Sequence, residues 1–382
     1  MKPVKTAVIG CGAISDIYLT NMIEKFSYLE VMACCASHRD SAERKAAQFS
    51  IRAASTDEIL ADPEIELVVV LTPPPTHYGL VKKALLAGKH VYTEKPIAME
   101  LREARELLAL ADEKDLRLGT APETVMGSAL QTARKALDEG MIGEITSFHV
   151  VGNRNLTILA SLYKYLRGLG GGICCDYGVY YLTALVSLLG PMKEVYARVG
   201  NHSRIRTNNV DVSPEFGQDY VYENDAQVNA ILTTQSGIVG TFSLNGDSAA
   251  IDQAVFTIHG TKGILRLGDA NQFGGKIFYL PEGYFNDGWQ VLRPVSSLSD
   301  NLRGLGPADM ARHIREGGEH LLSKEMACHV LDVIESILES GKTGQVCVMR
   351  TNCERPAAFE DWASLQNRRR ENDRAGQLAH RL

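Results

Sequence analysis

The sequence predicts an α/β protein with an N-terminal, doubly wound parallel sheet and a C-terminal α+β domain that holds a large mixed or antiparallel sheet. Two observations support the first domain. Short Val- and Ile-rich segments alternate with helical segments from residue 4 to about residue 120, and the first of them runs directly into Gly10-Cys11-Gly12. After about Ala121 the pattern changes to segments of alternating polarity, which predicts a second domain of different architecture.

Composition sets broad limits on what the chain does. With 382 residues, 45% of them hydrophobic, the chain is long enough for two domains that each bury a core. A net charge of -6 gives no basic surface for nucleic acid, and we expect none as a partner. An apolar strand begins at Val4 and no apolar run is long enough for a membrane span, so we expect no signal peptide and no membrane contact.

The eight cysteines show no zinc-type spacing. Two adjacent pairs, Cys34-Cys35 and Cys174-Cys175, are typical of reduced, partly buried thiols in a cytoplasmic protein. We therefore predict a cytoplasmic location and no catalytic metal.

In the first domain, strands and helices alternate with the spacing of βαβ units. Strands are expected at residues 4–9, 29–36, 65–71, 90–93 and 117–120, and helices at 15–25, 41–49, 77–86 and 101–114. In such sheets, ligands bind at the carboxyl ends of the strands. Four positions fall at such ends and should converge there, namely Gly10, Ser37, Thr72 and Lys95.

The second domain begins with a helix near residues 130–140 and a strand at 145–151. A glycine-rich turn at residues 168–172 leads into a helix near 175–189. Further strands are expected at 226–233, 240–244, 254–259 and 263–267, and a helix at 324–340 should pack back on the body of the protein. We place the domains at residues 1–122 and 123–355, with a C-terminal tail at 356–382.

The glycine turn fits a Rossmann-type dinucleotide site. Gly10 would make the tight turn, and Gly12 would let the backbone approach a pyrophosphate at the helix N-terminus, although Ser15 replaces the third glycine of the motif. The alternative is a strand–helix turn with no ligand. The expected cofactor contacts here are Gly10, Cys11, Gly12, Ala13 and Ile14.

The end of the second strand addresses the choice between NAD and NADP. An acidic residue there would bind the ribose 2′-hydroxyl of NAD, but the chain has Ser37, His38 and Arg39. A hydroxyl and basic groups suit the 2′-phosphate of NADP, which is slightly favoured. The alternative is that Arg39 is an exposed residue at a helix start, so NAD remains open.

The ends of the third and fourth strands add further candidates. Leu71, Thr72, Pro73 and Pro74 should form a stiff loop beside the cofactor, and His77 would either contact the nicotinamide ribose or lie on the surface. Glu94-Lys95-Pro96 follows the fourth strand, where an ammonium group beside a nicotinamide can polarise a hydroxyl or ketone. Glu94 and Pro122 complete the expected cofactor contacts.

These segments together resemble the Gfo/Idh/MocA family of NAD(P)-dependent oxidoreductases. The resemblance rests on residues 4–15, 71–77 and 87–91, on Glu94-Lys95-Pro96, and on Asp176-Tyr177-Gly178-Val179-Tyr180. It implies a dimer or tetramer of identical chains, a catalytic Lys95 near the nicotinamide, and a loop shaped by Glu94 and a proline that is usually cis. It also implies an Asp in the substrate domain followed four residues later by a His, which correspond to Asp176 and Tyr180.

The tyrosine is a departure with chemical consequences. Residues four apart on a helix share a face, so Asp176 and Tyr180 should project together. A phenol has a reference pKa of about 10, so Tyr180 needs a nearby cation to act as a base at neutral pH. We expect Lys95 to be that cation, with Asp176 orienting the substrate. The alternative is that Tyr180 only stacks under the substrate while Lys95 alone handles the proton.

The expected reaction is oxidation of a secondary hydroxyl of a sugar, glycoside or cyclitol. One candidate within this class is oxidation at C3 of a glucoside by an enzyme that holds its cofactor tightly. Polar and aromatic candidates for binding the substrate are Asn153, Arg154, Tyr163 and Tyr165, together with Lys95, Asp176 and Tyr180. One alternative is an NAD(P)-dependent glycosidase that oxidises its substrate transiently and then eliminates. Another is a non-catalytic, cofactor-sensing protein.

Overall fold

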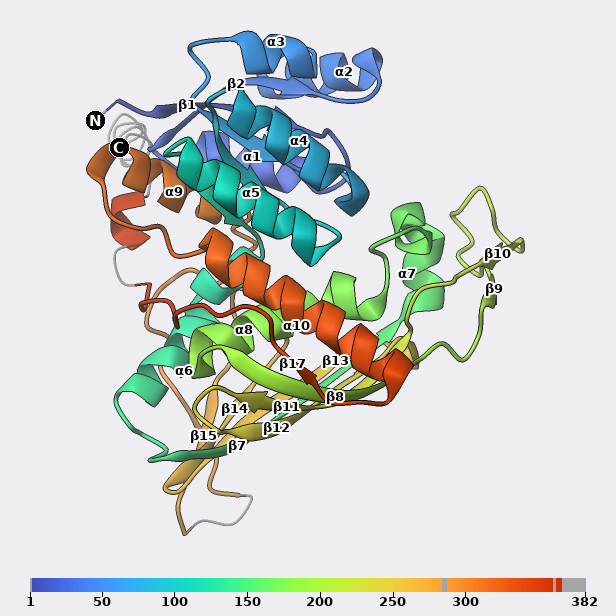
Figure 1. Ribbon diagram of the computed structural model, residues 1–382, viewed down its shortest axis with the longest axis vertical. Helices are drawn as coiled ribbons and strands as arrows, with labels where there is room; N and C mark the ends of the chain where they lie inside the picture. The colour runs from blue at the N-terminus through green and yellow to red at the C-terminus, as the bar shows by residue number, and fades with distance from the viewer. Residues whose placement is uncertain (1, 284–286, 360–361, 366–382) are drawn as a thin grey trace, which may run out of the picture.

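The computed structural model describes residues 2–283, 287–359 and 362–365, and Figure 1 shows two sheets joined by helices. The N-terminal sheet has six parallel strands in the order β3-β2-β1-β4-β5-β6. Its strands are β1 (Val4–Ile9), β2 (Leu29–Cys35), β3 (Arg52–Ala53), β4 (Leu67–Val70), β5 (His90–Thr93) and β6 (Leu118–Thr120). This order confirms the doubly wound sheet that the sequence predicts.

Both faces of this sheet are covered by helices. They are α1 (Ser15–Glu24), α2 (Arg39–Phe49), α3 (Thr56–Ala61), α4 (His77–Leu86) and α5 (Leu101–Glu113), with α4 and α5 side by side. The sequence of β4 is apolar throughout because both of its faces are buried. Val68 and Val70 enter one core, and Leu67 and Val69 enter the core on the opposite face. The short β3 and α3 are absent from the expectations above, since two residues and six residues carry little periodic signal.

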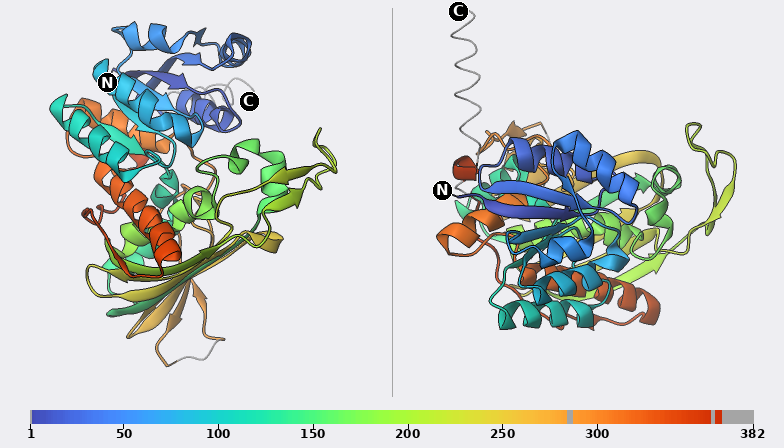
Figure 2. Two further views of the ribbon diagram at one scale, coloured as in Figure 1. Left: turned by 45° about the vertical axis from the view of Figure 1, so that its right-hand side comes forward. Right: turned by 90° about the horizontal axis from the view of Figure 1, so that it is seen from above.

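The second sheet has nine strands in the order β16-β15-β14-β13-β7-β12-β11-β8-β17. Strands β7 and β12 are parallel and all other neighbours are antiparallel, so the sheet is mixed. The strands are β7 (Ile145–Asn155), β8 (Met192–Gly200), β11 (Gln227–Thr234), β12 (Val239–Asn245), β13 (Asp247–Gly260), β14 (Gly263–Leu267), β15 (Phe278–Pro281), β16 (Gln290–Val291) and β17 (Cys347–Val348). A separate hairpin of β9 (Ile205–Thr207) and β10 (Asp219–Val221) projects from the body (Figure 2).

In the described part of the chain, helices cover one face of the nine-stranded sheet. They are α6 (Ser128–Asp138), α8 (Val179–Leu189) and the long α10 (Lys324–Thr343), which lie between the two sheets in Figure 1. Shorter segments are α7 (Leu156–Leu162) and the turns η1 (Pro74–Thr76), η2 (Glu123–Met126), η3 (Lys164–Arg167), η4 (Cys174–Gly178) and η5 (Trp362–Leu365). The other face is open and exposes Val151, Ile231, Val239 and Val255.

Two C-terminal helices connect the domains. α9 (Leu305–Glu316) packs against α1, β1 and β2 of the N-terminal sheet, although the chain reaches it after the second sheet. α10 packs against α5 on one side and against α8 and β8 on the other, as the sequence predicts. Packing therefore crosses the boundary that we expect at residue 122.

Most of the expected tail at 356–382 lies outside the described residues. None of the helices in the described part of the chain is long and apolar enough to cross a membrane.

Candidate active site

The turn after β1 has the geometry that a dinucleotide requires. Gly10 has φ +113°, and a Cβ there would lie 2.7 Å from the carbonyl carbon of Leu71, so only glycine fits. Around Gly12, a Cβ would meet no atom within 4 Å, and no side chain caps the first turn of α1 at Ile14. Exposed backbone at an uncapped helix N-terminus suits a pyrophosphate. The residues present therefore fit the expected cofactor.

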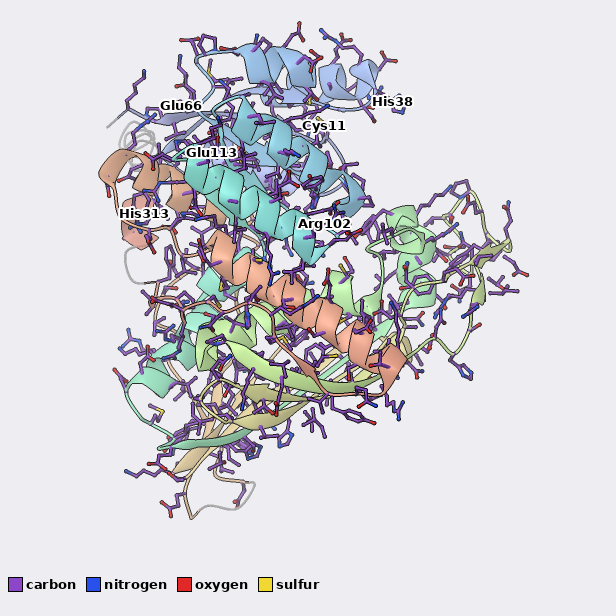
Figure 3. The ribbon with its side chains drawn as sticks, viewed as in Figure 1. Cys11, His38, Glu66, Arg102, Glu113 and His313 are labelled. Atoms are coloured by element: carbon purple, nitrogen blue, oxygen red, sulfur yellow. The ribbon has the colours of Figure 1, made fainter. Side chains whose placement is uncertain are left out.

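The end of β2 lies at the same edge of the sheet. The amide of Gly10 donates to the carbonyl of Cys35 (2.9 Å), and Figure 3 shows Cys11 and His38 on the same side of the domain. Ser37 and His38 are exposed. The guanidinium of Arg39 lies 2.8 Å from Glu43 and 4.0 Å from Glu58, so an exposed ion pair orients it.

His77 holds two loops of this edge together. Its Nδ1 lies 2.7 Å from the carbonyl oxygen of Pro96, and its Nε2 lies 2.7 Å from that of Thr72. The ring is fully buried, and this burial lowers the pKa of His77. The interpretation of His77 as a surface residue is therefore wrong, and its contact with the nicotinamide ribose stays a prediction. The ring fixes the Thr72-Pro73-Pro74 loop against the loop of Lys95.

The Glu94-Lys95-Pro96 segment joins the two domains. The Lys95–Pro96 peptide bond is cis, as the family resemblance implies. Glu94 accepts hydrogen bonds from the Tyr18 hydroxyl (2.7 Å) and from the backbone amide of Lys95 (3.1 Å). These contacts fix the base of the lysine, so that its side chain leaves the sheet edge and reaches the second domain.

The ammonium group of Lys95 binds Asp176. Its Nζ lies 2.8 Å from Oδ1 of Asp176 and 2.8 Å from the backbone oxygen of the same residue. The two side chains are only 12% and 11% exposed. Burial acts to lower the pKa of Lys95, but the negative charge of Asp176 and the nearby phenol of Tyr180 outweigh it and raise the pKa above its ordinary value. Lys95 is therefore a charged ammonium group at neutral pH.

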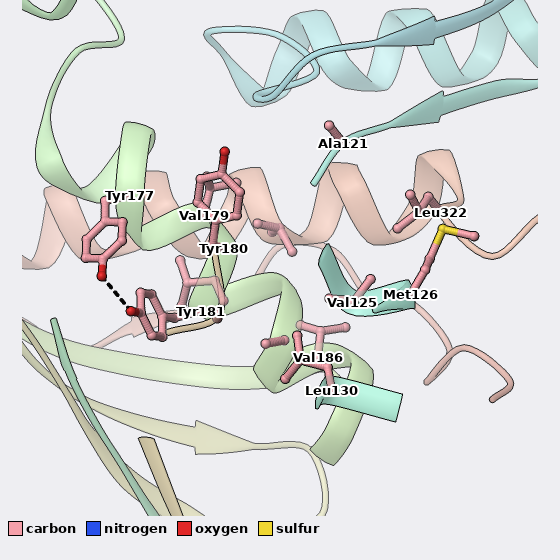
Figure 4. Packing of buried hydrophobic residues seen from close by; sticks show 14 of the residues in the cluster. Ala121, Val125, Met126, Leu130, Tyr177, Val179, Tyr180, Tyr181, Val186 and Leu322 are labelled. Atoms are coloured by element: carbon pink, nitrogen blue, oxygen red, sulfur yellow. Dashed lines mark hydrogen bonds between the residues drawn. The ribbon is translucent and has the colours of Figure 1, made fainter. Parts of the chain in front are cut away.

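Tyr180 lies on the same face of the helix as Asp176. Asp176 is in the π-helical turn η4 and Tyr180 is in the first turn of α8. The Lys95 ammonium lies 5.1 Å from the centroid of the Tyr180 ring. In Figure 4 the hydroxyl of Tyr180 points away from the sheet below, whereas the hydroxyls of Tyr177 and Tyr181 bond to each other at 2.7 Å. The three residues that we expect to be catalytic are thus brought together.

Arg303 also reaches Tyr180, and sequence reasoning missed it. Its Nη2 donates to the Tyr180 hydroxyl oxygen at 3.3 Å and to Oδ1 of Asn271 at 2.9 Å. No motif marks this position, since Arg303 stands alone before the Gly304-Leu305-Gly306 run that opens α9. The signal that the sequence offers is a basic residue next to the glycines at the start of α9.

Glu123 is a second residue that sequence reasoning missed. It follows the buried Pro122, two residues after the end of β6, and its Oε2 accepts from the backbone amides of Gly304 (2.7 Å) and Leu305 (3.2 Å). Burial, with the nearby charge of Glu94, raises the pKa of Glu123 to about 8. The carboxyl of Glu123 caps α9 and so fixes the segment that carries Arg303.

The structure separates the expected substrate-binding residues. Nη1 of Arg154 lies 4.0 Å from Oδ2 of Asp176, and the charge of Asp176 raises the pKa of the Tyr165 phenol, so both belong to the site. The ring of Tyr163 lies 6.4 Å from that of Tyr165 and is 44% exposed. Asn153 lies away from these residues. Its side chain donates to Gln253 of the neighbouring strand β13, on the face of β7 opposite to the buried Val150 and Gly152.

A polar cluster continues from Arg154 below Tyr180. The Arg154 guanidinium lies 3.9 Å from the centroid of the Tyr177 ring, and its Nε lies 4.0 Å from Asp252. The Tyr181 hydroxyl donates to Asp269 at 2.6 Å. Positively charged donors and negatively charged acceptors of hydrogen bonds therefore lie next to one another in the region beyond Asp176.

Comparisons with known proteins agree with this architecture. Residues 4–121 match the model for the oxidoreductase family with an NAD-binding Rossmann fold, and residues 130–266 match the model for the GFO/IDH/MocA C-terminal domain. Over 89% of its length, the chain is 23% identical to scyllo-inositol 2-dehydrogenase (NADP(+)) of Bacillus subtilis, of which 94% is covered. An uncharacterized oxidoreductase of Schizosaccharomyces pombe is 34% identical over 54% of this chain and 57% of its own length. The chain thus spans little more than half of the fission-yeast relative.

Solved structures share the whole fold. Levoglucosan dehydrogenase in its apo form superimposes with a TM-score of 0.80 at 19% identity, over 92% of this chain and all of the other. A second structure of levoglucosan dehydrogenase, in complex with NADH and L-sorbose, gives a TM-score of 0.79 over 91% of this chain and 99% of the other. The two family models together match more than half of the chain, including all of the first sheet, and the chain belongs to the Gfo/Idh/MocA oxidoreductase family, with an NAD-binding Rossmann domain at its N-terminus.

Proposed function

We propose that this protein is an NAD(P)-dependent dehydrogenase that oxidises a secondary hydroxyl of a sugar, glycoside or cyclitol to a ketone. The observation that carries the proposal is the meeting of Lys95, Asp176 and Tyr180 at the carboxyl end of β5, where Gly10 and Gly12 leave room for a dinucleotide. A nicotinamide dinucleotide, when bound, supplies the acceptor for the hydride that leaves the carbinol carbon.

The proton of the alcohol is handled by the chain's own residues. Lys95 is charged and can donate a hydrogen bond to the reacting oxygen, which stabilises negative charge there during the reaction. Tyr180, in its phenolate form, takes the hydroxyl proton on its oxygen and becomes a neutral phenol as the carbon–oxygen double bond forms. Asp176 accepts a hydrogen bond from a neighbouring hydroxyl and so fixes which carbon reacts. The alcohol loses one hydride and one proton, which balances its oxidation to a ketone.

The charges around the site favour a neutral, hydroxyl-rich substrate. Lys95 is paired with Asp176, and Arg154 lies between Asp176 and Asp252. An anionic substrate group would need a free cation, but Lys95 and Arg154 lie against carboxylates and Arg303 is already bonded to Asn271, Asn301 and Tyr180. Alternating donors and acceptors instead suit vicinal hydroxyl groups, because each hydroxyl both donates and accepts.

Related proteins support this substrate class. Their names describe a cyclitol for scyllo-inositol 2-dehydrogenase, levoglucosan for the solved dehydrogenase, and a dTDP-linked sugar for the 3-reductase of Actinomadura kijaniata, which is 29% identical over 65% of this chain and 70% of its own length. Within this class we propose C3 of a glucoside as the first position to test, with a cofactor that stays bound between turnovers.

For the cofactor, we propose a preference for NADP over NAD. No carboxylate stands at Ser37 or His38, where the ribose 2′ position would lie. The ion pair of Arg39 with Glu43 is exposed, and exposed pairs contribute only about 0–1 kcal/mol, so Arg39 can turn to a 2′-phosphate at small cost.

We also propose that the open face of the nine-stranded sheet joins identical chains in a dimer or tetramer. Val151, Ile231, Val239 and Val255 form its apolar part and are 36% to 50% exposed. Light scattering of an Ile231→Glu variant should show the monomer if this face is the contact.

All eight cysteines are free thiols, which supports the cytoplasmic location that we propose.

One experiment tests the proposal as a whole. Purified protein is denatured, and the released nucleotide is identified by chromatography against NAD and NADP standards. Intact protein supplied with that nucleotide is then screened with glycosides and cyclitols for absorbance of the reduced nicotinamide. The proposal predicts a bound or bindable nucleotide and turnover with neutral polyols. Protein that binds neither nucleotide overturns it, and release of an aglycone without net reduction identifies a glycosidase instead.

A further inference from the structure

The guanidinium group of Arg303 is held in a fixed position beside Tyr180. Nη2 donates to Asn271 at 2.9 Å and Nη1 donates to Asn301 at 2.9 Å, while Nη2 also reaches the Tyr180 hydroxyl oxygen at 3.3 Å. The backbone oxygen of Arg303 accepts from Nδ2 of Asn21 at 2.8 Å, which ties the segment to α1. A cation in this position does not depend on the substrate for its orientation.

The direction of this hydrogen bond determines where the phenol proton can point. A guanidinium has donors only, so the oxygen of Tyr180 must accept from Arg303. The hydroxyl proton of Tyr180 is then directed elsewhere, where it can be given to a ketone oxygen. When that proton is absent, the same contact stabilises the phenolate, which is the form that accepts a proton from an alcohol.

Lys95 is less suited to this task than the sequence indicates. Both hydrogen bonds that its ammonium makes in the structure go to Asp176, one to the carboxylate and one to the backbone oxygen. Its contact with Tyr180 is with the ring, 5.1 Å from the centroid, and not with the hydroxyl oxygen. The two cations of the site therefore contact different partners.

We propose that Arg303 is the positioning residue that prepares Tyr180 for proton transfer, and that Lys95 serves the reacting oxygen and Asp176. This inference rests on the proposed function, because it assigns the activation of Tyr180 within the same reaction. It divides between two residues a task that the sequence assigns to Lys95 alone.

Other charged and titratable groups surround Tyr180 and set the background for this effect. Asp176 lies one helical turn before it on the same face, and Lys95 lies over its ring. Tyr165 of η3, Glu94 of the β5 loop and Tyr18 of α1 interact electrostatically with Lys95 or Arg303. Glu123 of η2 caps the helix that Arg303 precedes. Among these groups, Arg303 is the one that the structure shows bonded to the phenol oxygen.

The test compares Arg303→Met and Arg303→Lys with a matched control. Arg266→Met is the control, because Arg266 stacks on the rings of Phe278 and Trp289 and belongs to neither the cofactor edge nor the Tyr180 contacts. For alcohol oxidation, the acidic limb of the kcat/KM profile should move to higher pH by about one unit in Arg303→Met. Activity should then recover at high pH, and Arg303→Lys should fall between this variant and the wild type.

Nucleotide affinity is measured alongside the pH profile. Arg303→Met should bind the nucleotide within about threefold of the wild type, because the residue does not contact the Gly10 turn, and Arg266→Met should leave both measurements unchanged. A loss of rate that is equal at every pH would overturn the inference, since a merely structural residue would give that result.

A second measurement separates the inference from the proposed function. Tyrosinate absorbance is titrated in the wild type and in Tyr180→Phe, and the difference isolates Tyr180 from the other tyrosines of the chain. The same difference is recorded in the Arg303→Met background, without substrate. Ionisation of Tyr180 at higher pH in that background supports Arg303, even if no polyol is turned over and the proposed function fails. Superimposable difference curves overturn it, even if the wild type is an active dehydrogenase.

Discussion

The ammonium group of Lys95 lies 2.8 Å from the carboxylate of Asp176, while its contact with Tyr180 is limited to the ring, 5.1 Å from the centroid. This ion pair links the two domains at the candidate site, since Lys95 follows β5 of the first sheet and Asp176 precedes α8 of the second domain. Substrate would bind where this pair, the phenol of Tyr180 and the glycine turn face each other. Opening of the domains would therefore separate the residues that we propose to be catalytic.

Removing the charge of Lys95 should slow turnover strongly. Lys95→Met keeps a side chain of similar volume but removes the ammonium group, and we expect kcat to fall roughly 100- to 10,000-fold. The unpaired Asp176 carboxylate should also cost about 3–5 kcal/mol of unfolding free energy, because both side chains are nearly buried. Steady-state kinetics and urea unfolding measure the two effects. The double variant Lys95→Met/Asp176→Asn should recover stability but no activity; recovered activity would contradict the assignment.

Tyr180 is expected to act through its hydroxyl group. Tyr180→Phe keeps the ring beside Lys95 but removes the proton acceptor, so kcat should fall roughly 100- to 10,000-fold while the affinity for nucleotide stays the same. The remaining activity should lose the acidic limb of its pH profile. Tyr181→Phe is the matched control, since that hydroxyl is bonded to Tyr177 and Asp269 below the site. If the phenylalanine at position 180 leaves kcat unchanged, the phenol serves only as a stacking surface.

His77 should matter for stability and not for chemistry. His77→Phe leaves at least one of two buried carbonyl oxygens, those of Thr72 and Pro96, without a donor, which costs about 1–3 kcal/mol. Both loops border the cofactor edge, so nucleotide affinity should weaken while the pH profile of kcat stays in place. Thermal unfolding and nucleotide titration check this, with the exposed His149→Phe as control. A changed pH profile would show that His77 takes part in proton transfer.

Glu123 should make the protein less stable as the pH rises. Its pKa of about 8 in the folded state lies above the ordinary value of 4.5, so between these values the folded protein holds more protons than the unfolded chain. The free energy of unfolding then falls with increasing pH, at most by about 1.4 kcal/mol per pH unit from this one group. Glu123→Gln can still accept from Gly304 and Leu305, and urea unfolding at pH 5 to pH 8 should show a smaller loss than in the wild type. Parallel curves for the two proteins would exclude this role.

A carboxylate at the end of β2 should reverse the cofactor preference. In Ser37→Asp, the new charge would repel a 2′-phosphate and could accept hydrogen bonds from a ribose 2′-hydroxyl. The ratio of kcat/KM for NADP to that for NAD should fall roughly tenfold or more. Ser37→Asn, which lacks the charge, is the control. An unchanged ratio in Ser37→Asp would place the 2′ position elsewhere.

Much of the first domain could be predicted because each strand end carries its own signal. The glycine turn, the proline loop and the Glu-Lys-Pro segment are each short in sequence, and the parallel sheet necessarily brings their strands' carboxyl ends to one edge. The pairing of Asp176 with Tyr180 could also be predicted, since residues four apart on a helix lie on one face. The side of Asn153 could have been read from the alternation in β7, because Phe148 and Val150 face the core and put residue 153 on the opposite face.

Arg303 and Glu123 could not be predicted, because their partners are distant in sequence. Glu123 binds the amides of residues 304 and 305, and Arg303 reaches Tyr180 from 123 residues away along the chain. Helix α9, which follows Arg303, was missed because Gly304, Gly306 and Pro307 at its start are typical of a loop. Only tertiary packing of α9 against α1 and the first sheet brings the arginine to the site.

The most direct test of the account is a single-turnover measurement on wild-type protein, Lys95→Met and Tyr180→Phe. Each protein is saturated with NADP or NAD, mixed with a polyol that is labelled with deuterium at the carbinol carbon or unlabelled, and followed through the absorbance of reduced nicotinamide. We predict a fast, isotope-sensitive signal in the wild type and a rate at least about 100-fold lower in both variants at equal nucleotide occupancy. A wild type that binds nucleotide but reduces none with any neutral polyol, or variants that reduce it at the wild-type rate, would contradict the account.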